Sequence, residues 1–241
     1  MTDRPILFSG PMIKALLAGR KTQTRRIMKP QPQYGDELRG IYAPGLSAVF
    51  GDPDNPHEDD LSIRLFSLGD RLWVREAWRT SHYYDDLPPR DLQDGTPVKY
   101  EADGVWQNWG YKADSPRNCR LRASMHMPRW VSRLTLVVTD VRVHRIQDIS
   151  NGDAAAEGVS EHEEIVDIKT TPSGHPVEIH DYRYRVEGIG DDDEGYLDEW
   201  SAFRNLWITI NGEESWDQDP WVVAYTFEVH HTNIDQMEQA A

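Results

Sequence analysis

The chain of 241 residues has a single cysteine, Cys119, so it cannot form an internal disulfide bond. It also has no apolar run long enough to span a membrane. Its first residues, MTDRPILFSGPMIKALLAG, include an early acid and are interrupted by Gly10 and Pro11, unlike a signal peptide. These absences predict a reducing, cytoplasmic compartment and no membrane partner.

Basic residues are few, with 26 Lys and Arg against 41 Asp and Glu and a net charge of −15. Phosphate affinity comes from Lys and Arg, so this balance argues against general duplex DNA binding. The bases are nevertheless concentrated: residues 1–33 carry seven bases and one acid, and residues 112–145 carry eight and two. Residues 146–241 carry four bases and 23 acids. Either basic and acidic elements pair across the surface, or a local pocket takes an anionic ligand while its acidic surroundings repel bulk nucleic acid.

Several familiar chemical motifs are missing. The sequence has no GxxxxGK[ST], GxGxxG, HExxH, GxSxG or CxxC, which leaves P-loop, Rossmann, zincin and α/β-hydrolase assignments without their defining residues. None of the nine histidines has a spacing typical of metal ligands. We therefore expect neither a metal nor a cofactor. The 24 aromatic residues (9 Trp, 10 Tyr and 5 Phe) do predict a folded core.

The hydrophobic pattern predicts few helices and several long strands, hence an α+β fold with a small β-barrel. Helices are expected at 9–18, from Ser9 to a stop at Gly19, at 151–158 after Ser150, and at 196–208. The last of these presents Trp200, Phe203, Leu206 and Trp207 to the core. Strands are expected within 20–28, at 71–78, 97–102 and 221–229, and at 130–146 with a bulge near Asp140. Residues 29–56 and 79–96 are expected to be loops, and the acidic residues 160–195 an excursion from the core.

The run from Gly19 to Arg26 holds the most informative chemistry. A lysine beside other cations binds its proton less tightly, so Lys21 is a candidate base. The Thr24 hydroxyl is a candidate nucleophile, because such a weak nucleophile needs an adjacent base. Arg25 and Arg26 are candidate donors to a substrate or an oxyanion. The same run is also typical of a solvated basic strand.

The spacing Gly19-x-Lys21-x-x-Thr24-x-Arg26 resembles the GxKxxExR signature of the ASCH domain family. The runs RPILFSGPMIKALLAGRKTQTRR, GDRLWVREAW and MHMPRWVSRLTLVVTDVRVHRIQDIS are similar to phage and prophage ASCH proteins. This resemblance implies a PUA-like β-barrel. It predicts a single domain over residues 1–235, with insertions at about 36–66 and 160–195 and a polar tail at 236–241.

Within that family, one bacterial subgroup of small amidohydrolases removes the acetyl group from N4-acetylcytidine. Resemblance to it implies Thr24 as nucleophile, Lys21 as base and Glu157 as acid/base partner. Many family members have Glu where this chain has Thr24, and the amidohydrolases also have Thr there. The expected function is hydrolysis of an N-acylated pyrimidine nucleoside, with a small nucleoside or single-stranded RNA as partner. The alternative is an ASCH-type module that binds RNA or a modified base, or a ribonuclease. Without the resemblance, Glu157 would be an exposed carboxylate at a helix end.

Three residues of the strand at 71–78 are further candidates for substrate binding: Trp73, Arg75 and Glu76. A base could stack on Trp73 or on the Arg75 plane. Alternatively the tryptophan packs in the core and Arg75 pairs with an acid. Arg129 and Trp130 present the same two choices. A binding module would join Arg20, Arg25, Arg26 and the arginines of 117–133 in one continuous groove.

Overall fold

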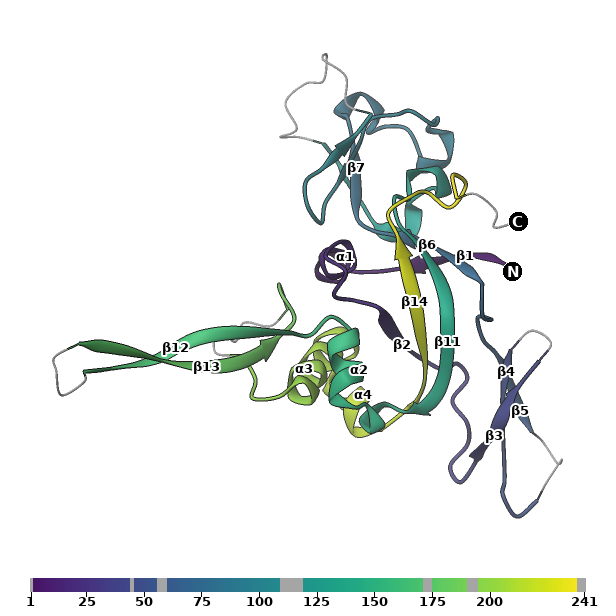
Figure 1. Ribbon diagram of the computed structural model, residues 1–241. Coiled ribbons are helices and arrows are strands. Elements are labelled where there is room, and N and C mark those ends of the chain that lie inside the picture. The colour runs from purple at the N-terminus through teal and green to yellow at the C-terminus, as the bar shows by residue number, and fades with distance from the viewer. Residues whose placement is uncertain are drawn as a thin grey trace.

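The structure is a computed structural model that describes residues 2–43, 46–55, 60–108, 119–170, 175–189 and 195–237, without the side chains of 164–166 and 181. Mixed α and β structure is observed, as predicted, with more strands than helices (Figure 1). In the described ranges no helix is both long and apolar enough to cross a membrane. Short 3-10 helices are η1 His82–Tyr84, η2 Pro89–Asp91, η4 Ser124–His126, η5 Arg129–Val131 and η6 Ile146–Asp148.

A five-stranded sheet in the order β1-β6-β11-β14-β2 forms the centre of the molecule. Its strands are β1 Asp3–Leu7, β6 Arg71–Arg75, β11 Thr135–Arg145, β14 Trp221–His230 and β2 Gln23–Ile27. Strands β1 and β6 are parallel, and the other neighbours are antiparallel. The register of β11 against β14 shifts between Val138 and Asp140, which confirms the predicted bulge.

The described strands form no closed barrel, which corrects the predicted β-barrel. Strands β1 and β2 lie at the two ends of the sheet and share no backbone ladder. Pro5 within β1 has no N–H to give to a further strand, as is usual for an edge strand. One side chain links the two edges instead: Arg26 Nη2 donates to the Leu7 carbonyl at 2.7 Å. We call the gap between β1 and β2 the seam.

Four helices accompany the sheets: α1 Gly10–Leu17, α2 Asn151–Ala156, α3 Glu199–Asn211 and α4 Glu213–Asp217. The helix predicted at 9–18 is confirmed as α1, and Gly19 follows it with φ 71°. The Ser150 hydroxyl accepts from the Asp153 N–H at 3.2 Å and caps α2, as predicted. Helix α3 begins three residues later than predicted and buries Phe203, Leu206 and Trp207.

The three-stranded sheet β3 Glu37–Tyr42, β4 Ser47–Gly51 and β5 Leu61–Arg64 contradicts the loop predicted for 29–56. Its side chains Ala48, Phe50 and Ile63 are buried in the main core. Phe50 meets Trp221 of β14 edge-on, at 5.0 Å between ring centroids. Of the prolines that suggested a loop, Pro30, Pro32 and Pro53 are described and lie outside these strands, so they do not interrupt them.

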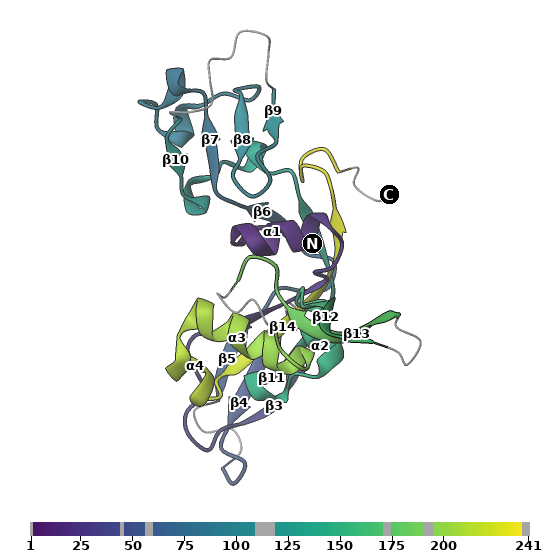
Figure 2. The same cartoon turned by 90° about the vertical axis from the view of Figure 1, so that its left-hand side faces the viewer.

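A second, smaller sheet has the order β10-β7-β8-β9, with bounds Leu121–Arg122, Trp78–Thr80, Val98–Tyr100 and Trp106–Gln107. It encloses its own apolar cluster, which contains Trp78, Leu92, Val98, Tyr100, Met127 and Val131. The strand predicted at 71–78 is therefore two strands, because β6 ends at Arg75 and β7 begins in the second sheet. Figure 2 shows α1 between this sheet and the group formed by α2, α3 and α4.

Strands β12 Ser160–Thr170 and β13 Pro176–Arg185 form a two-stranded sheet and project from the body as an arm (Figure 1). At the base of the arm, Tyr184 of β13 also bridges Tyr196. Residues 167–170 and 175–178 are exposed. The predicted excursion from the core is thus confirmed for these residues, although its form is a long hairpin.

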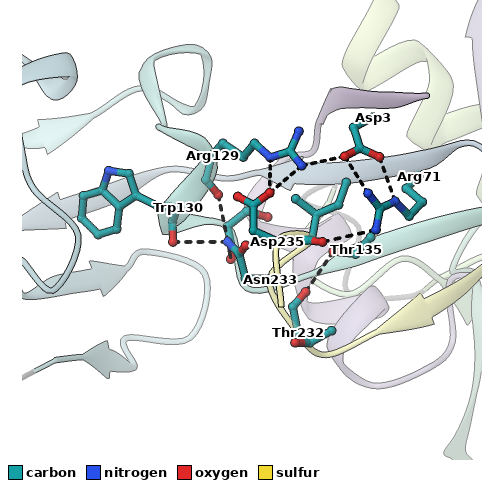
Figure 3. Close-up of polar contacts among 10 residues, drawn as sticks. Asp3, Arg71, Arg129, Trp130, Thr135, Thr232, Asn233 and Asp235 are labelled. Carbon is teal, nitrogen blue, oxygen red and sulfur yellow. Dashed lines mark hydrogen bonds and ion pairs between the residues drawn. The ribbon is translucent and has the colours of Figure 1, made fainter. Parts of the chain in front are cut away.

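A polar cluster holds β1 and the C-terminal segment against η5 (Figure 3). Arg129 Nη2 donates to Asp3 and to Asp235, each at 2.6 Å. Asn233 Nδ2 donates to the Arg129 carbonyl at 2.9 Å and to the Ser132 carbonyl at 2.7 Å. Arg129 therefore binds acids of the chain itself, and its contacts give it a structural role.

Candidate active site

A cavity of about 340 Å³ lies at the seam. Its lining comes from the end of β1, the start of α1, strand β2, the end of α2 and one face of α3. The lining residues are Leu7, Phe8, Ser9, Met12, Lys21, Thr24, Arg25, Arg26, Ile27, Lys29, Glu157, Phe203, Leu206, Trp207, Ile210 and Asn211. Five of the predicted site residues therefore meet here: Lys21, Thr24, Arg25, Arg26 and Glu157.

Lys21 is positioned by the chain reversal that follows α1. After Gly19, the backbone N–H groups of Arg20 and Lys21 both donate to the Ala15 carbonyl, at 3.0 and 3.1 Å. The next N–H, of Thr22, donates to the Ala156 carbonyl at 2.9 Å. This bond joins the turn to α2, so Lys21 faces a residue far from it in sequence.

Glu157 is the C-cap residue of α2 and is 3% exposed. Gly158 follows with φ +105°, and a Cβ there would lie 3.1 Å from Ala15 Cβ and 3.6 Å from Lys21 Cβ. Only glycine suits both this backbone conformation and this close approach. Gly158 thus allows α2 to end directly against α1, which buries the Glu157 carboxylate.

Lys21 and Glu157 form a buried ion pair. Lys21 Nζ lies 2.6 Å from Glu157 Oε2 and 2.9 Å from the Glu157 carbonyl oxygen, with the Lys21 side chain 1% exposed. Burial lowers the pKa of Lys21, and the charges of Arg26 and Arg25 lower it further, although Glu157 opposes this change. A single short hydrogen bond therefore connects an ammonium group of lowered pKa with a carboxylate, and a proton needs to move only along that bond.

Arg25 completes the charge balance behind the pair. Its Nη1 donates to Glu157 Oε1 at 3.1 Å and to Gln23 Oε1 at 2.6 Å, and its Nη2 lies 3.1 Å from Asp153 Oδ2. Asp153 also accepts from Arg142 at 2.7 Å. Burial opposes ionisation of Asp153, but the Arg142 hydrogen bond and the charges of Arg25 and Arg142 hold its pKa at about 2.

Thr24 is a buried residue whose hydroxyl has no partner in the described part of the chain. The residue is 4% exposed and pairs through its backbone with Tyr225. Among the described residues its hydroxyl makes no hydrogen bond. Thr24 and Arg25 point to opposite faces of β2, and both reach the cavity because β2 is an edge strand. A bound molecule is the available partner for this hydroxyl.

The apolar wall of the cavity is the part that the sequence did not reveal. Phe203, Leu206 and Trp207 are buried as predicted, but they also line the cavity together with Phe8 and Met12. An apolar helix stripe has the same spacing whether it meets a core or a ligand. No sequence feature therefore separates these two roles.

Trp73, Arg75 and Glu76 do not line the cavity. Trp73 is 6% exposed, and the Arg75 guanidinium lies 4.3 Å from its ring centroid. Glu76 accepts two hydrogen bonds from Arg133, at 2.8 and 2.9 Å. The side chains of these three residues are thus engaged elsewhere, and the structure does not bring them to the Lys21–Glu157 pair.

The second basic segment does not join the cavity either. Lys112 and Arg117 lie outside the described residues, and no described arginine of 117–133 lines the cavity. Arg133 binds Glu76 and Asp103, and Arg20 of the first segment pairs with Glu187 at 3.0 Å. These ion pairs do not favour the continuous groove expected of a binding module.

In the part of the chain that the structure describes, no group of three or more His, Cys, Asp or Glu side chains is placed to hold a metal ion. No family model, curated protein or solved structure matches this chain.

Proposed function

We propose that the protein is an amidohydrolase that removes the acyl group from an N-acylated pyrimidine nucleoside such as N4-acetylcytidine. One observation carries the proposal: Lys21 and Thr24, from one short run, line the same cavity as Glu157, which comes from a distant part of the chain. Its volume of about 340 Å³ lies within the usual range for small-molecule sites. The resemblance to ASCH amidohydrolases, with their PUA-like fold, supports the same three residues.

The first half of the reaction uses the proton shared by Lys21 and Glu157. In the tautomer with neutral Lys21 and protonated Glu157, Lys21 Nζ removes the Thr24 hydroxyl proton and Thr24 Oγ attacks the amide carbon. Arg26 stabilises the oxyanion. The C–N bond then breaks, Glu157 gives its proton to the leaving amine, and an acyl-Thr24 ester remains.

The second half restores the enzyme. Glu157, now a carboxylate, takes a proton from water, and the hydroxide attacks the ester carbon. When the C–O bond breaks, Thr24 Oγ takes back a proton from the Lys21 ammonium group. The products are the free nucleoside and a carboxylic acid. Lys21 and Thr24 share no hydrogen bond without substrate, and such catalytic contacts often tighten only when substrate binds.

The test is incubation of purified protein with N4-acetylcytidine, with release of cytidine followed by chromatography. Thr24→Val keeps the shape of the side chain but removes the nucleophile, so it should abolish turnover. Thr22→Val is the matched control, because Thr22 is exposed two residues away and does not line the cavity. It should retain full turnover.

Two results would contradict the hydrolase. Turnover that persists in Thr24→Val would exclude Thr24 as the nucleophile. Saturable binding of N4-acetylcytidine without any release of cytidine would instead favour the binding module.

A further inference from the structure

We propose that the substrate of this cavity carries a phosphate group, so that the ligand is an N-acylated nucleoside monophosphate and not the free nucleoside. This inference rests on the proposed function and specifies its substrate class. It is argued from the charges around the cavity.

The cavity is strongly cationic in an acidic protein. Its described lining contains four cations, Lys21, Arg25, Arg26 and Lys29, and one carboxylate, Glu157. The chain as a whole has a net charge of −15. A local excess of positive charge in an acidic molecule attracts a small anion and still repels large polyanions.

Two of the four cations are neutralised inside the protein. Lys21 and Arg25 bind Glu157, and Arg25 also lies 3.1 Å from Asp153. Arg26 and Lys29 are exposed, and neither pairs with an acid among the described residues. Arg26 donates to the Leu7 carbonyl through Nη2 and keeps other N–H groups free. These two side chains are therefore available to a phosphate at the mouth of the cavity.

The start of α1 adds to the positive potential. Ser9, at the N-cap position, and Met12 of the first turn both line the cavity. The Ser9 hydroxyl makes no capping hydrogen bond, so it remains free to bind a ligand. The positive end of a helix favours anions. Thr24, a residue only 4% exposed, lines the same cavity with a hydroxyl that has no hydrogen-bond partner among the described residues, which also indicates a bound ligand.

The apolar part of the lining and the volume of the cavity indicate that the ligand is a single nucleotide. Phe8, Phe203 and Trp207 provide an apolar surface for a planar base. At about 340 Å³ the cavity can hold one nucleotide but not a polymer. No described arginine of 117–133 extends the basic lining, so a longer strand would meet few further cations.

The experiment compares kcat/KM for N4-acetylcytidine 5′-monophosphate and 3′-monophosphate with that for N4-acetylcytidine. At low salt, at least one phosphorylated substrate should be preferred by roughly tenfold or more, as one or two charge-assisted contacts provide. The ratio of the two kcat/KM values should fall at high salt, because salt screens the charge of exposed cations. Equal or lower kcat/KM for both phosphorylated forms would overturn the inference.

Two lysine variants test the source of the preference. Lys29→Gln should reduce the ratio of nucleotide to nucleoside kcat/KM by about tenfold. Lys14→Gln removes an exposed lysine of α1 that does not line the cavity, and should leave the ratio unchanged. An unchanged ratio in Lys29→Gln would remove Lys29 from the phosphate site.

Equilibrium binding separates this inference from the proposed function. If no substrate is hydrolysed, the hydrolase is excluded, but calorimetry with cytidine monophosphate and cytidine still tests the phosphate. Tighter binding of cytidine monophosphate would support the phosphate site, and equal binding would refute it. Tighter binding of a short single-stranded oligocytidine than of the mononucleotide would refute the single-nucleotide assignment.

Discussion

At the scale of single residues, the site depends on a lysine that is buried almost completely. Lys21 is 1% exposed, and among the described residues its side chain donates hydrogen bonds only to Glu157, to the carboxylate and to the backbone carbonyl. Removal from water disfavours the ammonium form and prepares Lys21 to accept a proton. The carboxylate keeps the proton nearby when Lys21 releases it.

The pH dependence of turnover follows from this environment. Because the pKa of Lys21 is lowered by burial from its usual 10.5, neutral Lys21 becomes populated at a lower pH than in a free lysine. We expect kcat/KM to fall as the pH rises through this lowered pKa, below pH 10.5, because loss of the proton shared with Lys21 leaves Glu157 with none to give to the leaving amine. Lys21→Arg should lose at least about 100-fold in turnover, since arginine stays protonated. A pH–rate profile checks both expectations, with Lys14→Arg as the control; a flat profile would argue against Lys21 as the base.

Asp153 gives stability a separate pH dependence. Its pKa of about 2 in the folded chain lies below the usual 3.8, so the folded state favours its ionised form. That stabilisation is present above about pH 4 and is lost as the pH falls toward about 2. Urea unfolding across this window should show Asp153→Asn and wild type differing most above pH 4 and converging at lower pH. A difference independent of pH would contradict this assignment.

The site residues that lie close together in sequence were predictable. Lys21, Thr24, Arg25 and Arg26 follow from one run, and all four line the cavity. Glu157 was reached only through the family resemblance, because no local pattern shows that a helix-end carboxylate will be buried. Trp73 and Arg75 had suitable chemistry, but their position depends on which sheet and which neighbours the fold provides.

At the scale of elements, Gly158 controls how closely α2 approaches α1. An alanine there would adopt a strained backbone at φ +105° and place its Cβ 3.1 Å from Ala15 Cβ. We expect Gly158→Ala to destabilise the fold by about 1 to 3 kcal/mol and to reduce turnover by displacing Glu157.

The matched control is Gly152→Ala, at the start of α2. A Cβ at Gly152 meets nothing within 4 Å and its φ is not positive, so this change should be neutral or stabilising by up to about 1 kcal/mol. Urea denaturation of both variants measures the difference. Equal stability of the two would show that the approach of α2 to α1 is not constrained.

Elements with a strong period or clear end residues were predictable from sequence. The helix before Gly19 lies within one residue of its predicted bounds. The bulged strand was also found, but β11 begins five residues later than predicted, after the 3-10 helix Arg129–Val131. Strands β3 to β5 were missed because they are short and separated by prolines. Their apolar residues are recognised as core residues only from tertiary packing, such as that of Phe50 on Trp221. Closure of the sheet depends on how its two edges meet, which local pattern does not specify.

At the scale of the whole molecule, the arm is separable from the site. Most of β12 and β13 contacts only the partner strand, and their described residues do not line the cavity. Isolated two-stranded hairpins gain little stability from the pairing itself.

Shortening the arm tests this independence. Residues 163–182 can be replaced by Asn-Gly, which joins the paired residues His162 and Arg183 by a tight turn. The free energy of unfolding should change by less than about 1 kcal/mol, and turnover should be retained. Calorimetry and the cytidine assay check this, and loss of turnover in a folded variant would assign the arm a role at the site.

The pairing of β2 with β14 also determines when the site can form during synthesis. Strand β2 carries Thr24 and pairs, among the described strands, with β14 alone. Residues 23–27 leave the ribosome early, while residues 221–230 are translated last among the strands. A nascent chain without β14 has no partner to order β2, because long-range strand pairs form only when both strands are present. We therefore expect hydrolysis to begin only after residues 221–230 have been translated, so that chains that stop before β14 carry no activity.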